Sequence, residues 1–516
     1  MGFLRLRKYF DIQISIRTPV NINRRTILKT AVVTPGLALM HDSVAEAASK
    51  MRVKNVVPGV TPFISNVTIS GVSLSSLQTI EFVVQPKKGS TTKGIGATYT
   101  LSYLNSKGLT NPAAGEVTIP VFGLYASDAI SRNVVMFTIR CKGVKTLLSY
   151  SLITKPWLDP TGGGFSKPVV TQARDSKVAL GFSTFLMKGW SNANTPVISD
   201  TDGEVRWVAP TTSTIAGPTS GFFDNALYMG SGNELIRADL NGTLTNLASY
   251  DSYGYTNINE HNIDLGKRGM LIEAQTSADN ESCIIEVDAK GVLLNSWNFA
   301  TIVSEAMVAG GDDPTLFVAR TADWFHSNAA TYSKASNELI VSSRENFVIA
   351  VDYDSKRIKW ILGDASKAWY GFASLRAFAL QLGPNTTAPI GQHAVSITPQ
   401  NELLLFDDGM SSTFQVPAGA TRSNSVARKY VINRSTMTAT EVWNFNHTPS
   451  ISSHYTSSVY QAANSYVIDY AFNPSGPLLV GLGANNKVAF QYTYPGGSVM
   501  GWNAVPVDLS NLIFTA

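Results

Sequence analysis

Three histidines in the second half of the chain stand in similar short polar contexts. They are His261 in Asn-Glu-His-Asn, His326 in Phe-His-Ser-Asn and His393 in Gly-Gln-His-Ala, and their separations are 65 and 67 residues. In a repeat protein, equivalent positions of successive repeats converge in space. The spacing therefore predicts that three imidazoles meet at one site.

Asn328 and Arg344 are the other polar residues expected at this site. Asn328 lies two residues after His326, so in an extended strand both side chains face the same side. Arg344 ends the strand that follows and returns to the same edge. Its guanidinium is a permanently charged fork that suits an oxyanion. Imidazole can be a donor, an acceptor, a nucleophile or a proton carrier near neutral pH.

These side chains favour a tetrahedral oxyanion, such as sulfate or phosphate, over a metal ion, because Arg344 repels a cation. No motif commits a carboxylate to the cluster, and no cofactor is expected. A tri-histidine metal site is one alternative. Three separate, hydrogen-bonded structural histidines are another. Cys141 and Cys283 are the only cysteines, and we expect two buried, unpaired thiols.

Repeating strands should position the histidines. After about residue 181, units of short apolar strands end in small polar turns and close with an aromatic residue. The closing aromatics include Trp207, Trp297, Trp360 and Trp443. Six such units predict a six-bladed β-propeller over 181–516, with each motif histidine just before the innermost strand of its blade. A pair of β-sandwiches would explain the strands but not the regular closing aromatics.

The segment before the repeats is simpler. Residues 56–157 alternate apolar and polar positions between turns, which predicts a small antiparallel β-sandwich. Residues 158–180, with three consecutive glycines, are expected to form a linker. The predicted fold class is therefore all-β, a six-bladed propeller preceded by a small N-terminal β-sandwich. A composition of 44% hydrophobic and 15% charged residues fits a folded protein of this kind.

Residues 1–47 have the features of a twin-arginine-type signal peptide. Arg24 and Arg25 precede an apolar run over 31–40, and Ala-Glu-Ala follows at 45–47. The run is too short for a stable membrane anchor, so we expect a periplasmic or otherwise exported protein. Seven of the 41 basic and three of the 37 acidic residues lie here. The remainder has no net charge, so no nucleic-acid partner is expected.

The motifs around the histidines carry a family resemblance. The run Asp323–Asn328, then Ser343-Arg344 and Trp360-Ile-Leu-Gly-Asp364, together resemble the bacterial arylsulfotransferases that do not use PAPS. Gly391-Gln-His393 with Leu403–Gly409, and the segment that starts at His261, are similar to further blocks of that family. The resemblance extends from about Ser183 to the C-terminus. A closely spaced cysteine pair found in enterobacterial members has no counterpart in this chain.

The resemblance implies transfer of a sulfuryl group from a phenolic sulfate ester to a phenol, by a ping-pong reaction through a sulfohistidine. It also implies small-molecule partners and a homodimer. A hydrolase that uses water as the acceptor, and a non-catalytic propeller that binds an anion, remain the alternatives. The resemblance implies that His393 is the nucleophile and that His326, Asn328 and Arg344 hold the sulfuryl oxygens. His261 is the acid/base at the phenolic oxygen or helps to neutralise the sulfuryl group. Thr456, rather than Ser457 or Ser458, supplies a substrate-binding hydroxyl.

Overall fold

The computed structural model describes residues 51–516 except 127–128, 158–167, 191–195, 211–218 and 495–499. The predicted signal peptide over 1–47 lies outside these residues. Strands dominate the described chain and helices are short, so the prediction of an all-β protein is confirmed. Within the described residues, no helix is long and apolar enough to cross a membrane.

Two sheets form the N-terminal part of the described chain. The first has the order β1 (Arg52–Pro58), β2 (Ile64–Ser70), β6 (Glu116–Phe122), β5 (Thr110–Asn111). The second has the order β36 (Leu512–Phe514), β4 (Ile95–Thr100), β3 (Leu77–Val84), β7 (Ser131–Cys141), β8 (Val144–Thr154), and the helix α2 (Leu101–Ser106) follows β4. Alternate side chains of the two sheets, among them Val67, Phe82, Ile119 and Phe137, share one apolar core. We interpret this pair as the predicted sandwich.

Six further sheets of mainly antiparallel strands succeed one another along the chain. The first sheet has the order β35 (Met500–Val507), β10 (Thr184–Trp190), β11 (Val197–Asp200), β12 (Val205–Val208), and the second β13 (Ser220–Phe223), β14 (Ala226–Ser231), β15 (Glu234–Asp239), β16 (Leu244–Ser249); in the third, β17 (Tyr255–Asn257) and β18 (Ile263–Leu265) lie beside β19 (Met270–Thr276), which β20 (Cys283–Val287) and β21 (Leu293–Asn298) follow. The fourth sheet has the order β22 (Ser327–Ser333), β23 (Glu338–Ser343), β24 (Val348–Asp352), β25 (Ile358–Leu362), and the fifth β27 (His393–Ile397), β28 (Leu403–Asp407), β29 (Val426–Asn433), β30 (Thr438–Phe445), β26 (Gln381–Leu382). The sixth has the order β31 (Ser458–Ala462), β32 (Ser465–Tyr470), β33 (Leu478–Leu482), β34 (Val488–Thr493), β9 (Val169–Gln172).

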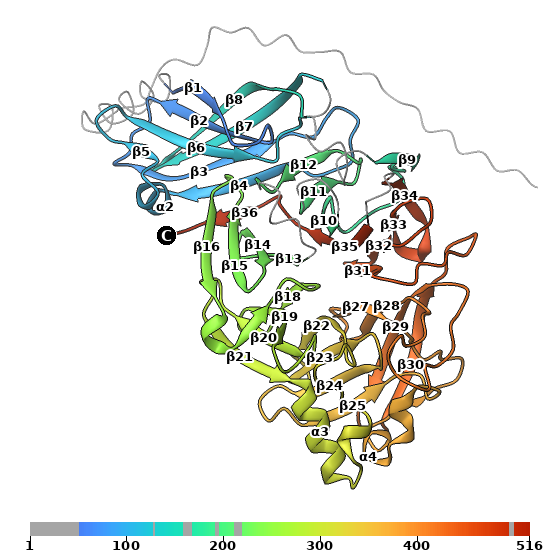
Figure 1. The fold of residues 1–516 in the computed structure, drawn as a ribbon. Helices are drawn as coiled ribbons and strands as arrows, with labels where there is room; N and C mark the ends of the chain where they lie inside the picture. The colour runs from blue at the N-terminus through green and yellow to red at the C-terminus, as the bar shows by residue number, and fades with distance from the viewer. Residues whose placement is uncertain (1–50, 127–128, 158–167, 191–195, 211–218, 495–499) are drawn as a thin grey trace, which may run out of the picture. The chain divides into compact units, whose positions relative to one another are not determined.

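The first strands of these sheets contact one another in sequence. Strand β13 contacts β18, β18 contacts β22, and the series continues through β27 and β31 to β35. Figure 1 shows these strands grouped around a common centre, with the other strands of each sheet farther out. This is the arrangement of a β-propeller, and we interpret the six sheets as its blades.

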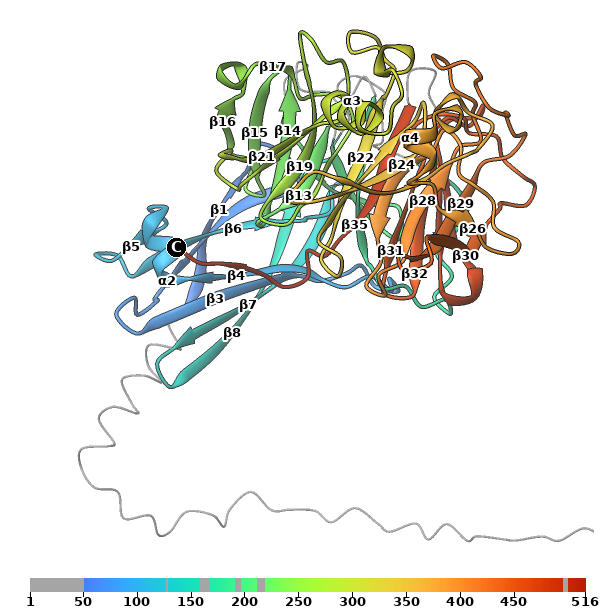
Figure 2. The ribbon, with the colours of Figure 1, turned by 90° about the horizontal axis from the view of Figure 1, so that it is seen from below.

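The chain crosses the predicted domain limits at two places. Part of the predicted linker, Val169–Gln172, forms β9 and pairs with β34 at the outer edge of the last blade. After β35 pairs with β10 in the first blade, Leu512–Phe514 leave the propeller and pair in parallel with β4. Figure 2 shows this C-terminal segment beside β4. An exposed edge strand leaves backbone N–H and C=O groups unpaired. The linker strand β9 and the C-terminal strand β36 pair with such groups at the edges of two sheets.

Local chemistry explains the blades. Strands such as β23 and β24 are rich in Val and Ile and are almost wholly buried, because each blade packs between two others. Turns in the outer parts use glycine where φ is positive, as at Gly242 after β15 and Gly291 after β20. The closing aromatics Trp207, Trp297 and Trp360 are buried, which supports a packing role.

Short helices lie in the connections between the blades. They are α3 (Phe299–Ala309), α4 (Ala373–Arg376) and the 3₁₀ turns at Asp251–Tyr253, Pro314–Leu316 and Ala368–Gly371. A further 3₁₀ turn, Ala484–Asn486, joins β33 to β34 within the last blade. Cys141 and Cys283 are both free and buried, as predicted.

Candidate active site

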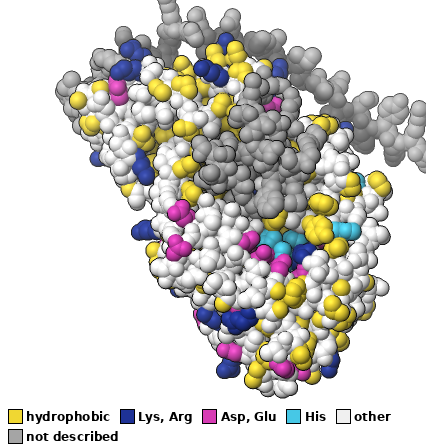
Figure 3. Space-filling model, viewed as in Figure 1, with side chains coloured by type: hydrophobic (Ala, Val, Ile, Leu, Met, Phe, Trp, Pro, Cys, Tyr) yellow, Lys and Arg dark blue, Asp and Glu magenta, His cyan; other side chains and the backbone are white. Residues whose placement is uncertain are grey.

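The structure brings the three motif histidines together. His261 lies two residues before β18, His326 directly precedes β22, and His393 begins β27, so all three stand at the same end of successive inner strands. The ring centroids of His261 and His326 are 4.8 Å apart, and those of His261 and His393 are 6.3 Å apart. Figure 3 shows histidine side chains gathered in one patch with acidic side chains.

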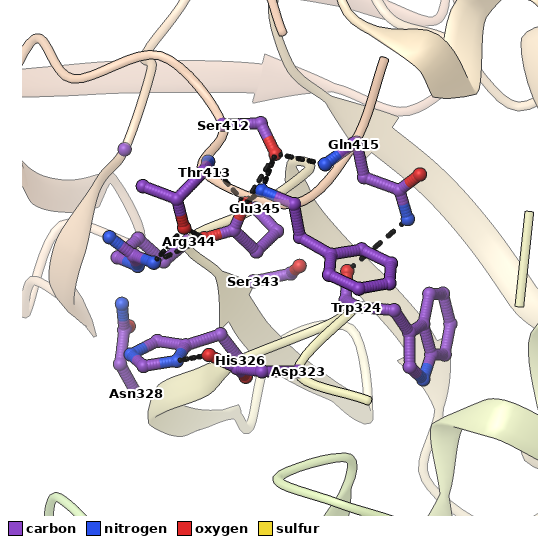
Figure 4. Close-up of polar contacts among 12 residues, drawn as sticks. Asp323, Trp324, His326, Asn328, Ser343, Arg344, Glu345, Ser412, Thr413 and Gln415 are labelled. Carbon is purple, nitrogen blue, oxygen red and sulfur yellow. Dashed lines mark hydrogen bonds and ion pairs between the residues drawn. The ribbon is translucent and has the colours of Figure 1, made fainter. Parts of the chain in front are cut away.

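His326 does not lie in a fully extended segment, because its φ is 53°. The backbone turns there, and the carbonyl of His326 accepts a hydrogen bond from the Arg344 N–H at 3.1 Å. Even so, Figure 4 shows the side chains of His326 and Asn328 beside each other, with Arg344 nearby. Asn328 Nδ2 donates to the carbonyl of Gln392 at 2.9 Å, which links this blade to the blade of His393.

Carboxylates surround the histidines, so the expectation that none is committed to the cluster is wrong. Asp323 Oδ2 lies 2.7 Å and Glu281 Oε2 lies 2.9 Å from Nδ1 of His326. The same oxygen of Glu281 lies 3.6 Å from Nε2 of His261. Glu281 belongs to a connection between strands, which no sequence periodicity places beside His326.

The surroundings separate the pKa values of two adjacent imidazoles. Burial lowers the pKa of His326, but its contacts with Asp323 and Glu281 outweigh burial and raise the pKa to about 9. Burial lowers the pKa of His261, and Glu281 compensates only in part. Burial acts against ionisation of Glu281 as well, yet the two imidazoles hold its pKa well below the usual range. His326 is therefore cationic and His261 neutral at neutral pH.

Asp408 is the buried partner of His393. Its Oδ2 lies 2.5 Å from Nδ1 of His393, and the Gly391 carbonyl oxygen lies 3.1 Å from the same nitrogen. Burial, with the charges of His261, His326 and Arg344, lowers the pKa of His393 well below 6.5. Because a carbonyl oxygen can only accept, Nδ1 carries the proton and Nε2 keeps its lone pair.

Arg344 is held by a buried acidic residue and a loop. Its Nη2 donates to Glu345 and, at 2.8 Å, to Thr413 Oγ1. Glu345 in turn accepts hydrogen bonds from the Thr413 and Phe414 N–H groups at 2.8 and 2.9 Å (Figure 4). Lys367, also buried, donates to the carbonyls of Arg344 and Glu345. Nε of Arg344 has no hydrogen-bond partner within the described part of the chain, so it is available to an anion.

Hydroxyl groups of the last blade hydrogen-bond to neighbouring backbone groups. The Thr456 hydroxyl donates to the Gly501 carbonyl at 3.1 Å, and the Ser458 hydroxyl accepts from the Ala504 N–H at 3.2 Å. The neighbouring Tyr455 ring faces the Arg344 guanidinium at 5.8 Å. Trp502, on β35, packs its ring 4.9 Å from that of His261. Two aromatic rings that the sequence did not single out therefore contact the charged cluster.

A cation is a second conceivable ligand for part of this cluster. Nitrogen and carboxylate atoms of His261, Glu281 and His326 lie within 4.8 Å of one another. However, the charge of Arg344 acts on His326, and a metal ion would have to displace the proton that His326 shares with two carboxylates. The donor set with Arg344 thus suits an oxyanion better.

A family model for arylsulfotransferases (ASST) matches residues 167–487. The chain belongs to the arylsulfotransferase family. The resemblance of the histidine motifs is thereby confirmed, and all three histidines, Asn328, Arg344 and Thr456 lie inside the matched region.

One curated relative of this family member is the arylsulfate sulfotransferase AssT of Escherichia coli O6:H1 (strain CFT073). The two are 25% identical over 218 residues, which cover 38% of this chain and 36% of the relative. The match thus spans about a third of that protein.

Three solved structures have low similarity to this arylsulfotransferase family member. BamB of Moraxella catarrhalis has 13% identity and a TM-score of 0.28, over 72% of this chain and 82% of that one. The Cps50 (Swd1) β-propeller domain of Myceliophteria thermophila has 11% identity and a TM-score of 0.35, over 65% of this chain and 89% of that one. Quinohemoprotein alcohol dehydrogenase of Comamonas testosteroni has 14% identity and a TM-score of 0.33, over 67% of this chain and 71% of that one.

Two of the missed carboxylates stand inside the motifs that carry the family resemblance. Asp323 opens the run that contains His326, and Asp408 lies in the Leu403–Gly409 block. Because these two acidic residues belong to motifs that also carry His326 and His393, the sequence could have assigned them as partners of those histidines. Glu281 and Trp502 lie outside those motifs, and only the tertiary structure reveals them.

Proposed function

We propose that this chain is an aryl-sulfate sulfotransferase that uses no PAPS and works by a ping-pong reaction through a sulfohistidine at His393. One observation carries the proposal: the Nδ1 atom of the buried, neutral His393 faces the Gly391 carbonyl, which can only accept a hydrogen bond, while Arg344 and a protonated His326 supply positive charge close by. A neutral imidazole with a free Nε2 lone pair is a nucleophile. Two cations beside it favour an anionic substrate.

In the first half-reaction, the Nε2 lone pair of His393 forms a bond to sulfur. The bond between sulfur and the phenolic oxygen breaks, and its electron pair stays on that oxygen. The bound sulfate ester is an anion and favours the protonated form of His261, which is otherwise neutral at neutral pH. The protonated His261 gives its proton to the oxygen, and the phenol leaves. Nδ1 is the nitrogen of His261 without a hydrogen-bond partner among the described residues, so we assign the proton transfer to this atom.

Charge on the sulfuryl oxygens is stabilised throughout this step. In the transfer of a sulfuryl group, as of a phosphoryl group, charge spreads over the peripheral oxygens, and positioning with electrostatic stabilisation dominates catalysis. Arg344 offers its free Nε–H, and His326 is the cationic donor beside it. Asn328 keeps one amide hydrogen beyond its bond to Gln392.

In the second half-reaction, an acceptor phenol attacks the sulfur of the sulfohistidine. The phenolic proton passes to Nδ1 of His261, the bond from nitrogen to sulfur breaks, and its electron pair returns to Nε2 of His393. His261 is then protonated and His393 neutral, so the cycle is closed and every proton is accounted for.

The test is incubation of the protein with 4-nitrophenyl sulfate, with and without added phenol. We expect release of 4-nitrophenol to increase with phenol, and phenyl sulfate to form in equal amount. With sulfur-labelled donor and no acceptor, an acid-labile label should appear on the wild type and not on His393→Ala. Release that does not depend on phenol would identify a hydrolase, and binding of sulfate without turnover would identify an anion-binding propeller.

Export and dimer formation are further parts of the proposal. The twin-arginine motif at residues 24–25 supports export to the periplasm or beyond the cytoplasm. Replacement of both arginines by lysine in the full chain should abolish export, measured by cell fractionation. Light scattering of the purified protein tests the homodimer.

A further inference from the structure

Among the described residues, Glu281 is the carboxylate that forms ion pairs with two motif histidines from different blades. It lies in the connection between β19 and β20, on the blade that follows His261, and its carboxylate contacts His261 and His326. Its φ is 39°, a left-handed conformation that is costly for a residue other than glycine. A strained backbone at a site needs support from its surroundings.

That support comes from the start of the next inner strand. The Glu281 carbonyl accepts hydrogen bonds from the N–H of Ser327 at 2.8 Å and from its hydroxyl at 3.0 Å. Ser327 directly follows His326, so the backbone of Glu281 is tied to the segment that carries His326. The Oε2 atom of Glu281 is buried and has no further hydrogen-bond partner among the described residues. The negative charge of Glu281 therefore interacts mainly with the imidazoles of His261 and His326.

We propose that Glu281 is a positioning residue for the sulfuryl transfer: its carboxylate keeps His326 protonated as the cation that holds the sulfuryl oxygens, and stabilises the proton that His261 takes up in the second half-reaction and donates in the next first half-reaction. This inference rests on the proposed function. One carboxylate shared by two imidazoles gives them different tasks, because His326 also contacts Asp323 at 2.7 Å, whereas Glu281 lies 3.6 Å from His261.

Other ionisable groups face the same imidazoles. Glu260, which directly precedes His261, and Asp323 add negative charge, while Arg344 and the neighbouring histidines add positive charge. Burial and Glu281 raise the pKa of Glu260 to about 7, so it is about half ionised at neutral pH. Removal of Glu281 leaves Asp323 in contact with His326 and favours ionisation of Glu260, so we expect the pKa of His326 to fall only in part.

The test is a histidine titration of Glu281→Gln by NMR with labelled histidine, which is practical because the chain has six histidines. The His326 signal is assigned from its absence in His326→Gln. We expect the pKa of His326 to fall by about 1 to 2 units in Glu281→Gln. In the same variant, the alkaline limb of kcat/KM for 4-nitrophenyl sulfate should move to lower pH by a similar amount.

Two variants keep the test informative. Glu305→Gln, on the exposed side of α3, removes the same charge away from the site and should leave both the titration and the pH profile unchanged. Glu281→Asp keeps the charge one methylene farther away and should restore most of the wild-type pKa, also if Glu281→Gln does not fold.

The outcomes separate the two proposals. An unchanged His326 titration in Glu281→Gln overturns the role of Glu281, even if the wild type transfers sulfuryl groups normally. A failure of Glu281→Asp to restore the His326 pKa overturns it too. Absence of sulfuryl transfer by the wild type, with a lowered His326 pKa in Glu281→Gln, overturns the proposed function but supports the electrostatic role of Glu281.

Discussion

Nδ1 of His393 lies 2.5 Å from Oδ2 of Asp408, and both residues are buried in the same blade. Burial raises the pKa of Asp408 well above its usual range, just as burial lowers that of His393. The pair therefore holds the imidazole in one tautomer and one orientation. The free Nε2 lone pair, on which the proposed reaction depends, is a consequence of this contact.

Asp408→Asn should lower kcat for aryl sulfate by roughly 10²- to 10⁴-fold with little change in KM, since an amide at this position no longer selects the productive tautomer. Steady-state kinetics with 4-nitrophenyl sulfate and phenol measure the effect. Asp354→Asn, on an exposed turn, is the matched control and should behave as wild type. Equal kcat values for Asp408→Asn and wild type would exclude the tautomer role.

His261→Gln should affect donors according to their leaving groups. A proton donor contributes about 10²- to 10⁴-fold when the leaving group is basic. We expect kcat to fall by that amount with phenyl sulfate, but by less than about tenfold with 4-nitrophenyl sulfate. The measurement is kcat for both donors with one acceptor. The same loss for the two donors would argue against acid/base action by His261.

Arg344→Lys should lower kcat/KM for the sulfate donor by roughly 10²-fold or more, because a lysine keeps the charge but not the planar fork. The lysine cannot reproduce the contacts with Glu345 and Thr413 while it also reaches a sulfuryl oxygen. Comparison with Arg376→Lys, at an exposed helix end, controls for the change of side chain. If Arg344→Lys retains wild-type kcat/KM, only the charge at this position matters.

The stability of the protein should depend on pH through His326. Its pKa is raised from 6.5 to about 9 on folding, so the folded state binds the proton more tightly than the unfolded state. This contribution to the free energy of unfolding, on the order of 3 kcal/mol, is fully present below pH 6.5 and is lost as the pH rises through 9.

Denaturant unfolding of wild type and His326→Gln at several pH values tests this dependence. Other buried groups titrate in both proteins, so the difference between the two curves is the quantity that reports on His326. We expect this difference to shrink between pH 6.5 and 9. A difference that stays constant across that range would show that His326 is not protonated in the folded protein.

Much of the fold and part of the site follow from the sequence. Repeated strands with closing aromatics predicted an all-β chain, and the spacing of His261, His326 and His393 predicted their convergence. Both conclusions rest on periodicity, because each strand of a blade buries its side chains in the same way in every repeat. The same reasoning put Arg344 near His326, and Arg344 directly follows β23, the second strand of that blade.

Only the tertiary structure decided which groups surround the imidazoles. Asp408 contacts His393 within one blade, and Glu281 contacts His326 from the preceding blade. Trp502, on the inner strand β35, packs against His261. The closing of the propeller by strands from both ends of the chain was equally absent from the sequence pattern. The contacts of Glu281 and Trp502 join residues far apart in the chain and belong to no repeat. Sequence periodicity therefore reveals which side chains lie at the centre, whereas their partners, and hence their protonation, depend on how the blades pack.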